Sequence, residues 1–552
     1  MVHATTNPRN NPATGIGAGD VRLLALLLAV TALVLGKDMS VGGFRDGDSA
    51  VHAMDGVLIH DWIAAGPKSW RDPMAFADQQ YAHYPSLGLG RHYPPGFALF
   101  EAAFFGAFGI SIWTARLCVV FFGLVAAAGT YAFMRQIADR AAAGLAVVAL
   151  ITMPATVLWG RQTMLEVPTL AALAWAAAAF VWYLRAPNWR RFAVLAAAMI
   201  FALFFKQTAV FLPGAVGFTL AYGAVRGVVR RSHGWGAVVI AVALVGLVAF
   251  SLGGHAAKLL HGDVTYPSFW SWNVLTGYLV IIPRQVGLPA FAVALLGAWI
   301  VARKGGLLQI LLVSWVFVCY AMLTVADFKF DRYLFVGLFP FAVWAAVGAR
   351  WLVGLLPSGW SQTAPMLAAT TWCVASAVAV SPEQRPDYGP VVLAHEAALR
   401  DRAVLFSGLR DGDFVFAVRQ HIPWRRATVI RGSKLLYTCN GRPDLDFAPH
   451  AFSPHDVVEL MRRFAFQHVF VERENKLGVA QDDWLRSYLS DSGDYKLVAK
   501  YPLLMGGQPS RRDVTLDVYQ AARPLVRTVE QFDLPIPRAG RTVRVDLGSG
   551  PP

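Results

Sequence analysis

The sequence predicts a polytopic α-helical membrane protein that carries an α/β domain in its C-terminal part. Hydrophobic residues make up 56% of the 552 residues, charged residues only 15%, and the mean hydropathy is +0.46. Apolar stretches of nearly membrane-spanning length recur through the first two-thirds of the chain. Helices suit such a composition because they satisfy their backbone hydrogen bonds within the segment.

We expect residues 1–20 to form a disordered cytosolic tail and residues 21–381 to form a transmembrane domain. The apolar segments predict about eleven spans by their length. The predicted spans are 21–36, 113–134, 142–158, 166–184, 192–205, 208–225, 235–253, 289–302, 306–325, 333–349 and 363–381.

Basic residues orient these spans. They gather in every second connection, around Arg135, Arg185, Arg226, Arg303 and Arg350. Because short cytosolic loops are enriched in arginine and lysine, these connections and the N-terminus are predicted to face the cytosol. The same patterning accounts for the net charge of +14, so nucleic-acid binding is not indicated. The expected location is a bacterial inner (plasma) membrane, with the C-terminal domain extracytoplasmic.

The segment 97–109 is apolar but too short to cross a bilayer comfortably. Counting it as a span would also reverse the side of every later basic loop. We therefore expect a helix that lies in or dips into the outer leaflet and begins after Pro94-Pro95. The first outer loop then runs over 37–112, and a connection of that length is usually functional.

A proline-containing and charged linker follows the last span. Beyond it, residues 382–524 are predicted to form a soluble extracytoplasmic α/β domain, followed by an extended tail at 525–552. The expected strands are 414–418, 427–430, 468–472, 495–498 and 514–518, and the expected helices are 391–406, 453–464 and 481–489.

Asp46 and Asp48 follow the first span directly. Carboxylates beside a bilayer are costly to desolvate and are usually functional, so the pair suits a general base. A D-x-D pair also suits a divalent cation, although two carboxylates alone are a weak metal signal. A solvated turn is the alternative, since Asp-Gly favours turns. Asp55 and Asp61 are expected on the polar face of a following surface helix.

A basic and aromatic run, Arg91-His92-Tyr93, precedes the two prolines. It could meet the phosphate headgroup and the sugar of a lipid-linked substrate, with help from the positive end of the following helix. The alternative is an interfacial aromatic belt.

Three further charged residues are predicted at the outer mouths of the spans. Glu166 could orient a substrate hydroxyl, or could pair with Arg161. Lys206 lies among apolar residues and calls for an anionic partner such as a lipid phosphate, unless it reaches water along the membrane. Arg284 is placed to contact phosphate.

These residues together resemble the membrane-embedded C-type glycosyltransferases. In particular they resemble bacterial relatives of dolichyl-phosphate-mannose–protein mannosyltransferase and of the aminoarabinose transferase that modifies lipid A. The resemblance covers about the first 350 residues, and it depends on the order and sidedness of the pieces. The matched pieces are Asp46-Gly-Asp, Tyr93-Pro-Pro-Gly-Phe, 108–117, 160–168, Lys206 with Pro213, and Arg332-Tyr-Leu with Pro340.

The resemblance implies a polyprenyl-phosphate-linked sugar as donor and catalysis on the extracytoplasmic face. Asp46 matches the acidic residue that is the family's expected base, and Glu166 matches a second acidic position that is often Asp. Tyr93 stands where relatives often have His or Lys before two prolines. The phosphate contact is therefore expected to pass to His92 or Arg91.

Through this resemblance the sequence predicts the inverting transfer of a sugar to an envelope glycan, lipid or protein. The predicted catalytic residues are Asp46, Asp48 and Glu166. The predicted donor-binding residues are Arg91, His92, Tyr93, Lys206 and Arg284. No cofactor is assigned, and a divalent cation at Asp46 and Asp48 stays open. The alternatives are a multi-span transporter or lipid flippase, which favours charges at the bilayer midplane and paired repeats, and a noncatalytic membrane scaffold.

Overall fold

The computed structural model describes residues 17–45, 47–85, 87, 93–252, 272–325, 330–357, 361–381, 386–438, 447–473, 478–503, 514–526, 529, 531–536 and 541–546. The chain forms two compact units. The helical unit comprises Met1–Asp38 and Arg116–Pro382, and the mixed unit comprises Met39–Ala115 and Glu383–Pro552. The first outer loop therefore groups with the C-terminal part of the chain.

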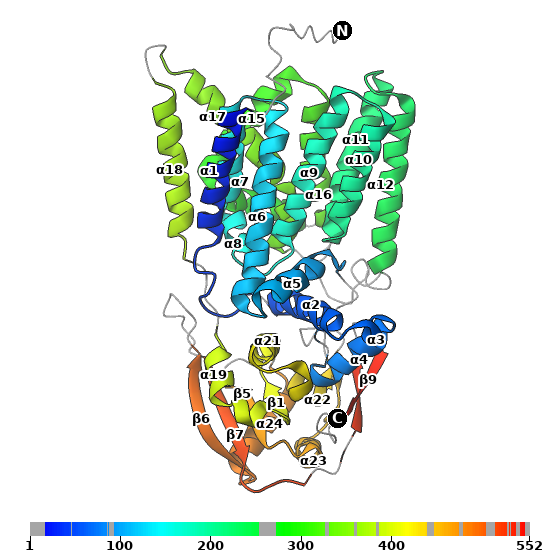
Figure 1. Ribbon diagram of the computed structural model, residues 1–552, viewed down its shortest axis with the longest axis vertical. Coiled ribbons are helices and arrows are strands. Elements are labelled where there is room, and N and C mark those ends of the chain that lie inside the picture. The colour runs from blue at the N-terminus through cyan, green and yellow to red at the C-terminus, as the bar shows by residue number, and fades with distance from the viewer. Residues whose placement is uncertain are drawn as a thin grey trace. The chain divides into compact units, whose positions relative to one another are not determined.

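The helical unit is built from long apolar helices that lie side by side (Figure 1). Among the described residues, six helices are long and apolar enough to cross a membrane, or up to nine if each sharply bent pair counts as one span. Each predicted span coincides with one or two helices, while the number eleven stays a prediction. The helices are α1 (Ala18–Leu35), α6 (Ile112–Arg135), α7 (Arg140–Thr152), α8 (Pro154–Gly160), α9 (Glu166–Arg185), α10 (Trp189–Leu203), α11 (Phe211–Val225), α12 (Arg231–Leu252), α14 (Trp272–Val286), α15 (Leu288–Lys304), α16 (Leu307–Val325), α17 (Phe339–Gly354) and α18 (Thr363–Ala379).

Helix α14 lies where the sequence predicted only a loop. Its apolar residues share one face. Pro283 lies near its C-terminal end, and because proline usually breaks helices, the sequence there does not indicate a helix. The two 3₁₀ segments, η2 (Gln207–Val210) and η3 (Asp331–Gly337), lead into α11 and α17.

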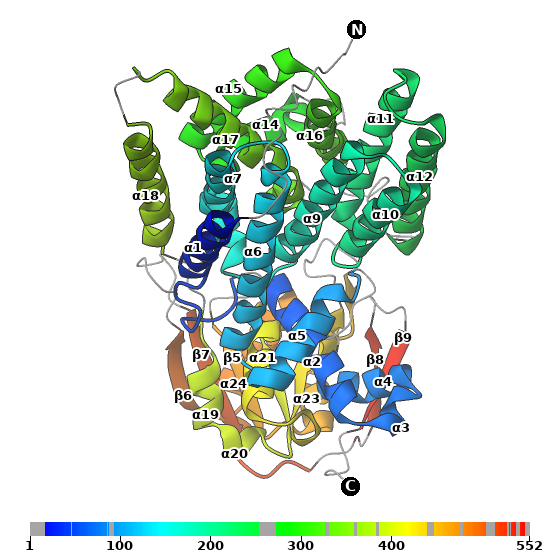
Figure 2. The ribbon, with the colours of Figure 1, turned by 45° about the horizontal axis from the view of Figure 1, so that its top comes forward.

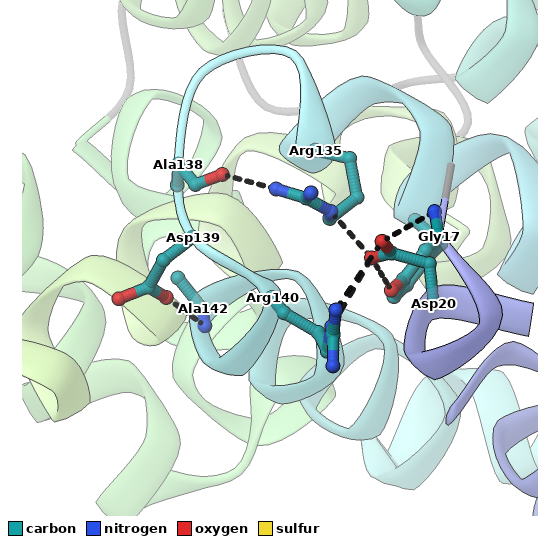
Figure 3. A network of polar contacts seen from close by, with 8 residues as sticks. Gly17, Asp20, Arg135, Ala138, Asp139, Arg140 and Ala142 are labelled. Carbon is teal, nitrogen blue, oxygen red and sulfur yellow. Dashed lines mark hydrogen bonds and ion pairs between the residues drawn. The ribbon is translucent and has the colours of Figure 1, made fainter. Parts of the chain in front are cut away.

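A network of polar contacts joins the start of α1 to the connection between α6 and α7 (Figure 3). Asp20 in the first turn of α1 accepts hydrogen bonds from Tyr131 Oη at 2.7 Å, Arg135 Nε at 2.7 Å and Arg140 Nε at 3.3 Å. Arg185 donates to the carbonyl of Gln136, and Arg350 pairs with Asp139. These contacts bring together the basic connections around Arg135, Arg185 and Arg350, while the sidedness of the loops stays a prediction.

Helices α15 and α17 cross with their backbones in contact. A Cβ atom on Gly297 would lie 1.8 Å from the carbonyl oxygen of Trp344, and one on Gly348 would lie 2.2 Å from that of Val293. Small residues at such a crossing allow close packing of apolar helices, which a membrane interior does not otherwise drive together.

The first outer loop forms four helices: α2 (Gly47–Ala64), α3 (Pro67–Trp70), α4 (Pro73–His83) and α5 (Gly96–Phe108). The 13-residue α5 begins after Pro95 as predicted, and it packs on α2 (Figure 2). The expectation that Asp55 and Asp61 lie on a polar surface is wrong, because both are buried. Asp61 accepts hydrogen bonds from Gln80 and Arg419 and also pairs with its neighbour His60.

The C-terminal part of the mixed unit contains a five-stranded sheet of order β2-β1-β5-β7-β6. Strands β1 (Ala403–Ser407), β2 (Thr428–Arg431) and β5 (His468–Glu472) are parallel, with Leu405 opposite both Ile430 and Val469. Strands β6 (Tyr495–Leu503) and β7 (Val514–Ala521) are antiparallel. The other elements are α19 (Gly389–Ala394), α20 (Glu396–Leu399), α21 (Asp411–His421), η4 (Trp424–Arg426), α22 (Gly432–Leu435), β3 (Tyr437–Thr438), β4 (Ala448–Pro449), α23 (Pro454–Phe464), α24 (Ala480–Asp491), β8 (Gln531–Ile536) and β9 (Arg541–Asp546).

Most of the predicted elements of this domain are present, with three corrections. Residues 414–418 were expected as a strand but belong to α21, and residues 403–406 were expected as helix but form β1. The tail includes an antiparallel pair, β8 and β9, in place of a single extended segment. Helix α23 lies within the predicted range 453–464, and Ser453 and Asp456 form a capping box at its start.

Candidate functional site

Five of the eight predicted site residues lie among the described residues. Asp48 and Tyr93 belong to the mixed unit, and Glu166, Lys206 and Arg284 belong to the helical unit. Asp46, Arg91 and His92 lie outside the part of the chain that the structure describes.

Glu166 and Lys206 form a buried ion pair. Glu166 is the first residue of α9, and Lys206 directly precedes η2. Lys206 Nζ donates to Glu166 Oε1 at 2.5 Å, and the two side chains are 5% and 1% exposed. The amides at the start of α9 add partial positive charge beside the carboxylate. Lys206 therefore does not reach along the membrane to water, and its anionic partner within this chain is Glu166.

The second oxygen of this carboxylate has spare capacity. Glu166 Oε2 is buried and accepts no hydrogen bond from the described residues. A buried carboxylate with one unused oxygen can accept a further donor, such as a substrate hydroxyl.

Aromatic and cationic side chains from η3 adjoin this pair. The ring centroid of Tyr333 lies 5.7 Å from Lys206 Nζ and 5.6 Å from the guanidinium carbon of Arg332. Arg332 is only 9% exposed. The sequence analysis did not connect Arg332 with Lys206. The available signal in the sequence was the family-like piece Arg332-Tyr-Leu.

Helix α14 packs against η3 and α8. Gln285 Nε2 donates to the carbonyl oxygen of Asp331, and Tyr278 is fully buried. Arg284, the neighbour of Gln285, is exposed. The structure therefore brings α14 to the Lys206 region through Gln285, while its predicted phosphate ligand Arg284 points away from the protein interior.

Arg161 is not the partner of Glu166, contrary to one alternative drawn from the sequence. Its guanidinium donates to the carbonyl oxygens of Val34, Ala377 and Val380. These carbonyls end α1 and α18, where helices leave their last carbonyls without internal partners. Arg161 is therefore a cap for two helix ends.

Asp48 lies in the first turn of α2, where an acidic side chain meets the positive end of the helix. One turn further along the same face, His52 is buried and its ring lies 4.9 Å from that of Tyr93 in an edge-to-face arrangement. The structure thus brings the Tyr93 segment to the helix that begins within the Asp-Gly-Asp motif. No group of three potential metal ligands occurs among the residues the structure describes.

A third buried acid lies behind this face. Glu101 of α5 is fully buried against Gly56 of α2, where a Cβ atom would approach to 2.6 Å from Glu101 Cβ. Neither carboxyl oxygen has a hydrogen-bond partner among the described residues. Burial and the neighbouring Asp55 raise the pKa of Glu101 well above its ordinary value. These surroundings favour the neutral form of the Glu101 carboxyl.

Comparison with known proteins places this architecture. The family model for dolichyl-phosphate-mannose-protein mannosyltransferase matches residues 92–251. A comparison with curated protein sequences finds no match. ArnT from Cupriavidus metallidurans, solved bound to undecaprenyl phosphate, is similar over 92% of this chain and 98% of its own, at 13% identity and a TM-score of 0.55. The apo state of the same protein is similar over 90% of this chain and 97% of its own, at 14% identity and a TM-score of 0.56.

A second solved structure extends the comparison to archaea. The oligosaccharyltransferase AglB from Archaeoglobus fulgidus, in complex with an inhibitory peptide and a dolichol-phosphate, is similar over 82% of this chain and 69% of its own. The identity is 10% and the TM-score 0.52. The predicted resemblance is thus confirmed at the level of architecture, and the chain has the fold of the C-type membrane glycosyltransferases.

Proposed function

We propose that this protein transfers a sugar from a polyprenyl-phosphate-linked donor to an acceptor of the cell envelope on the extracytoplasmic face. The observation that carries the proposal is the likeness of nearly the whole chain to a protein solved with undecaprenyl phosphate. The buried cation pair Lys206 and Arg332, compensated by Glu166, supports it, because a lipid phosphate needs fixed positive charge in a low-dielectric site.

The reaction requires a base, an electrophile and a stabilised leaving group. Asp46 would take the proton from the acceptor's hydroxyl or amine, and that atom would attack the anomeric carbon as the bond to the lipid phosphate breaks. Direct displacement inverts the anomeric carbon. The lipid phosphate leaves as an anion, which Lys206, Arg332, Arg91 and His92 are proposed to stabilise. Arg284 is proposed to contact the phosphate from the exposed side of α14.

Glu166 has a supporting role in this proposal. Its carboxylate is already engaged by Lys206, so it is better suited to orienting Lys206 and one substrate hydroxyl than to removing a proton. Asp48 and Tyr93 are proposed to line the substrate site at the N-terminal end of α2. A divalent cation at Asp46 and Asp48 stays open, and the mechanism above needs none.

The base assignment is tested with Asp46→Asn in membranes supplied with a radiolabelled polyprenyl-phosphate sugar. We expect transfer to fall by roughly 10²–10⁴-fold, the usual contribution of a general base. The matched control is Asp72→Asn, because Asp72 in the same loop caps α4 and asparagine caps equally well. Undiminished transfer by folded Asp46→Asn enzyme would reject the assignment.

The proposed sidedness is tested with single cysteines at exposed positions. Asp72→Cys should react with a membrane-impermeant maleimide from outside the cell, and Lys304→Cys only after the membrane is opened. The reverse pattern would place the proposed site on the cytosolic face and overturn the extracytoplasmic reaction.

A further inference from the structure

An arginine of the C-terminal domain reaches the peptide that enters α2. Arg410, the residue before α21, donates through its guanidinium to the carbonyl oxygens of Phe44 and Arg45, the latter at 3.2 Å. The two ends of this contact are more than 360 residues apart in the sequence. One planar group thus holds two successive carbonyls directly before the Asp-Gly-Asp motif.

The guanidinium is itself held in place. Arg410 Nε donates to Asp413 Oδ2 at 2.8 Å, and this ion pair is nearly buried, with side-chain exposures of 10% and 3%. The preceding residue is fixed as well, because the amide of Leu409 donates to Glu472 Oε2 at 3.0 Å at the end of β5. The phenol of Tyr388 donates to the other oxygen of Glu472. Arg410 therefore has little freedom to follow a moving loop.

Helix α21 supports α2 along its length, beyond this one contact. The ring of Phe44 packs edge-on against Phe416 with 5.0 Å between centroids. At the far end of both helices, Arg419 donates to both carboxylate oxygens of Asp61, with Nε at 3.0 Å from Oδ2. Two arginines at opposite ends of α21 thus anchor the two ends of α2.

A support of this kind has a consequence for chemistry. Side chains in a reacting site must be held within a fraction of an ångström, and supporting contacts from neighbouring elements supply that order. A bidentate guanidinium suits the task because its planar fork fixes direction as well as distance. The two carbonyls that it binds set the direction in which the chain enters α2, where Asp48 lies.

We propose that Arg410 is a positioning residue that orders the peptide entering α2, and that α21 of the C-terminal domain is the platform for this part of the first outer loop. The catalytic consequence rests on the proposed function, since it concerns Asp48 and the proposed base Asp46. The ordering itself does not depend on that function. The C-terminal domain then takes part in transfer without touching the reacting atoms.

The ordering is tested by a spin label at Gly47→Cys, in a chain whose Cys373 and Cys439 are replaced by serine. A Cβ atom on Gly47 would meet nothing within 4 Å, so the label has room. We expect the electron paramagnetic resonance lines to narrow when Arg410→Met is added, because the peptide gains mobility. The matched control is Arg426→Met, which removes an exposed pair with Asp401 in the same domain and should leave the spectrum unchanged. Identical spectra with and without Arg410 would overturn the proposal.

The catalytic consequence is tested by kinetics with radiolabelled polyprenyl-phosphate sugar. Arg410→Ala should lower kcat by roughly 10–100-fold, the cost of a small misplacement, while KM for the donor stays unchanged. Added guanidinium ion should restore part of the activity of Arg410→Ala and none of that of Asp46→Asn. A rise in KM alone, or no rescue, would contradict the positioning role.

Arg410→Lys covers the case in which the alanine variant does not fold, because lysine keeps the charge beside Asp413 but not the fork. It should fold, show narrowed lines and lose part of kcat. A lysine variant with the wild-type spectrum and wild-type kcat would overturn the proposal. If the wild-type protein transfers no sugar, the proposed function fails, and the spectra alone still decide whether Arg410 orders the peptide.

Discussion

Two buried carboxylates of the helical unit, Asp20 and Glu166, are held in opposite ways. Asp20 accepts from a phenol, two arginines and the amide of Gly17, so both of its oxygens are used. Glu166 accepts from Lys206, while its second oxygen has no hydrogen-bond partner among the described residues. Asp20, with both oxygens occupied, has the features of a structural contact between helices. Glu166, with one unoccupied oxygen, has the features of a ligand-binding group.

The contrast between Asp20 and Glu166 is tested most strongly by neutralising both Glu166 and Lys206. The double variant Glu166→Gln/Lys206→Met should keep its thermal stability close to that of the wild type, since replacing both members of a buried pair is often neutral. Its transfer activity should fall by about 10²–10³-fold, because the leaving phosphate loses a preorganised charge. Thermal unfolding in detergent and transfer assays measure both. Full activity in the double variant would make the pair purely structural.

Glu101 is a third buried carboxyl, and it has no cationic partner among the described residues. Burial and Asp55 raise the pKa of Glu101 above its ordinary 4.5. The native state therefore favours the protonated form, and its stability falls as pH rises from about 4.5 towards the raised pKa. The slope is about 1.4 kcal/mol per pH unit over that window.

Glu101→Gln should remove this slope, since glutamine is neutral in both states. The variant should be more stable than the wild type at pH 8, and the two should converge below pH 4.5, as measured by denaturant unfolding across pH. Parallel curves at all pH values would show that folding does not raise the pKa of Glu101. An infrared carbonyl band of a protonated acid, absent in Glu101→Gln, provides an independent reading.

The smallest effect is expected at the saturated group. Asp20→Asn should lower the melting temperature and leave transfer per folded molecule unchanged, because Arg135 and Arg140 are partly exposed and can be hydrated. Tyr131→Phe removes one donor to the same carboxylate and should cost about 1 kcal/mol, the usual value of a hydrogen bond. A loss of transfer in folded Asp20→Asn enzyme would erase the proposed contrast between the two carboxylates.

The membrane part was predictable because apolar length alone locates helices, and each predicted span meets a helix of the structure. Elements of the C-terminal α/β domain were harder to predict where all of their sides are buried. Residues 412–418 of α21 are buried throughout, and a continuous apolar run has no period that separates helix from strand. Helix α14 escaped detection for a different reason, its internal proline.

Site residues were predictable by type but not by partner. A lone lysine among apolar residues correctly indicated an anionic partner, but Glu166 lies 40 residues away in the sequence. Asp61 was read as exposed because its arginine, Arg419, comes 358 residues later. Such pairings depend on which elements pack together, and local sequence carries no record of it.

The grouping of residues 39–115 with the C-terminal half has a practical consequence for hybrid enzymes. Exchanging only the C-terminal domain for that of a relative would pair a foreign α21 with the native α2, and the contacts of Phe44, Arg45 and Asp61 would be lost together. A graft that carries both pieces of the mixed unit keeps those matched surfaces intact. The donor and acceptor preferences of two relatives can then be recombined while the contacts between α2 and α21 are kept.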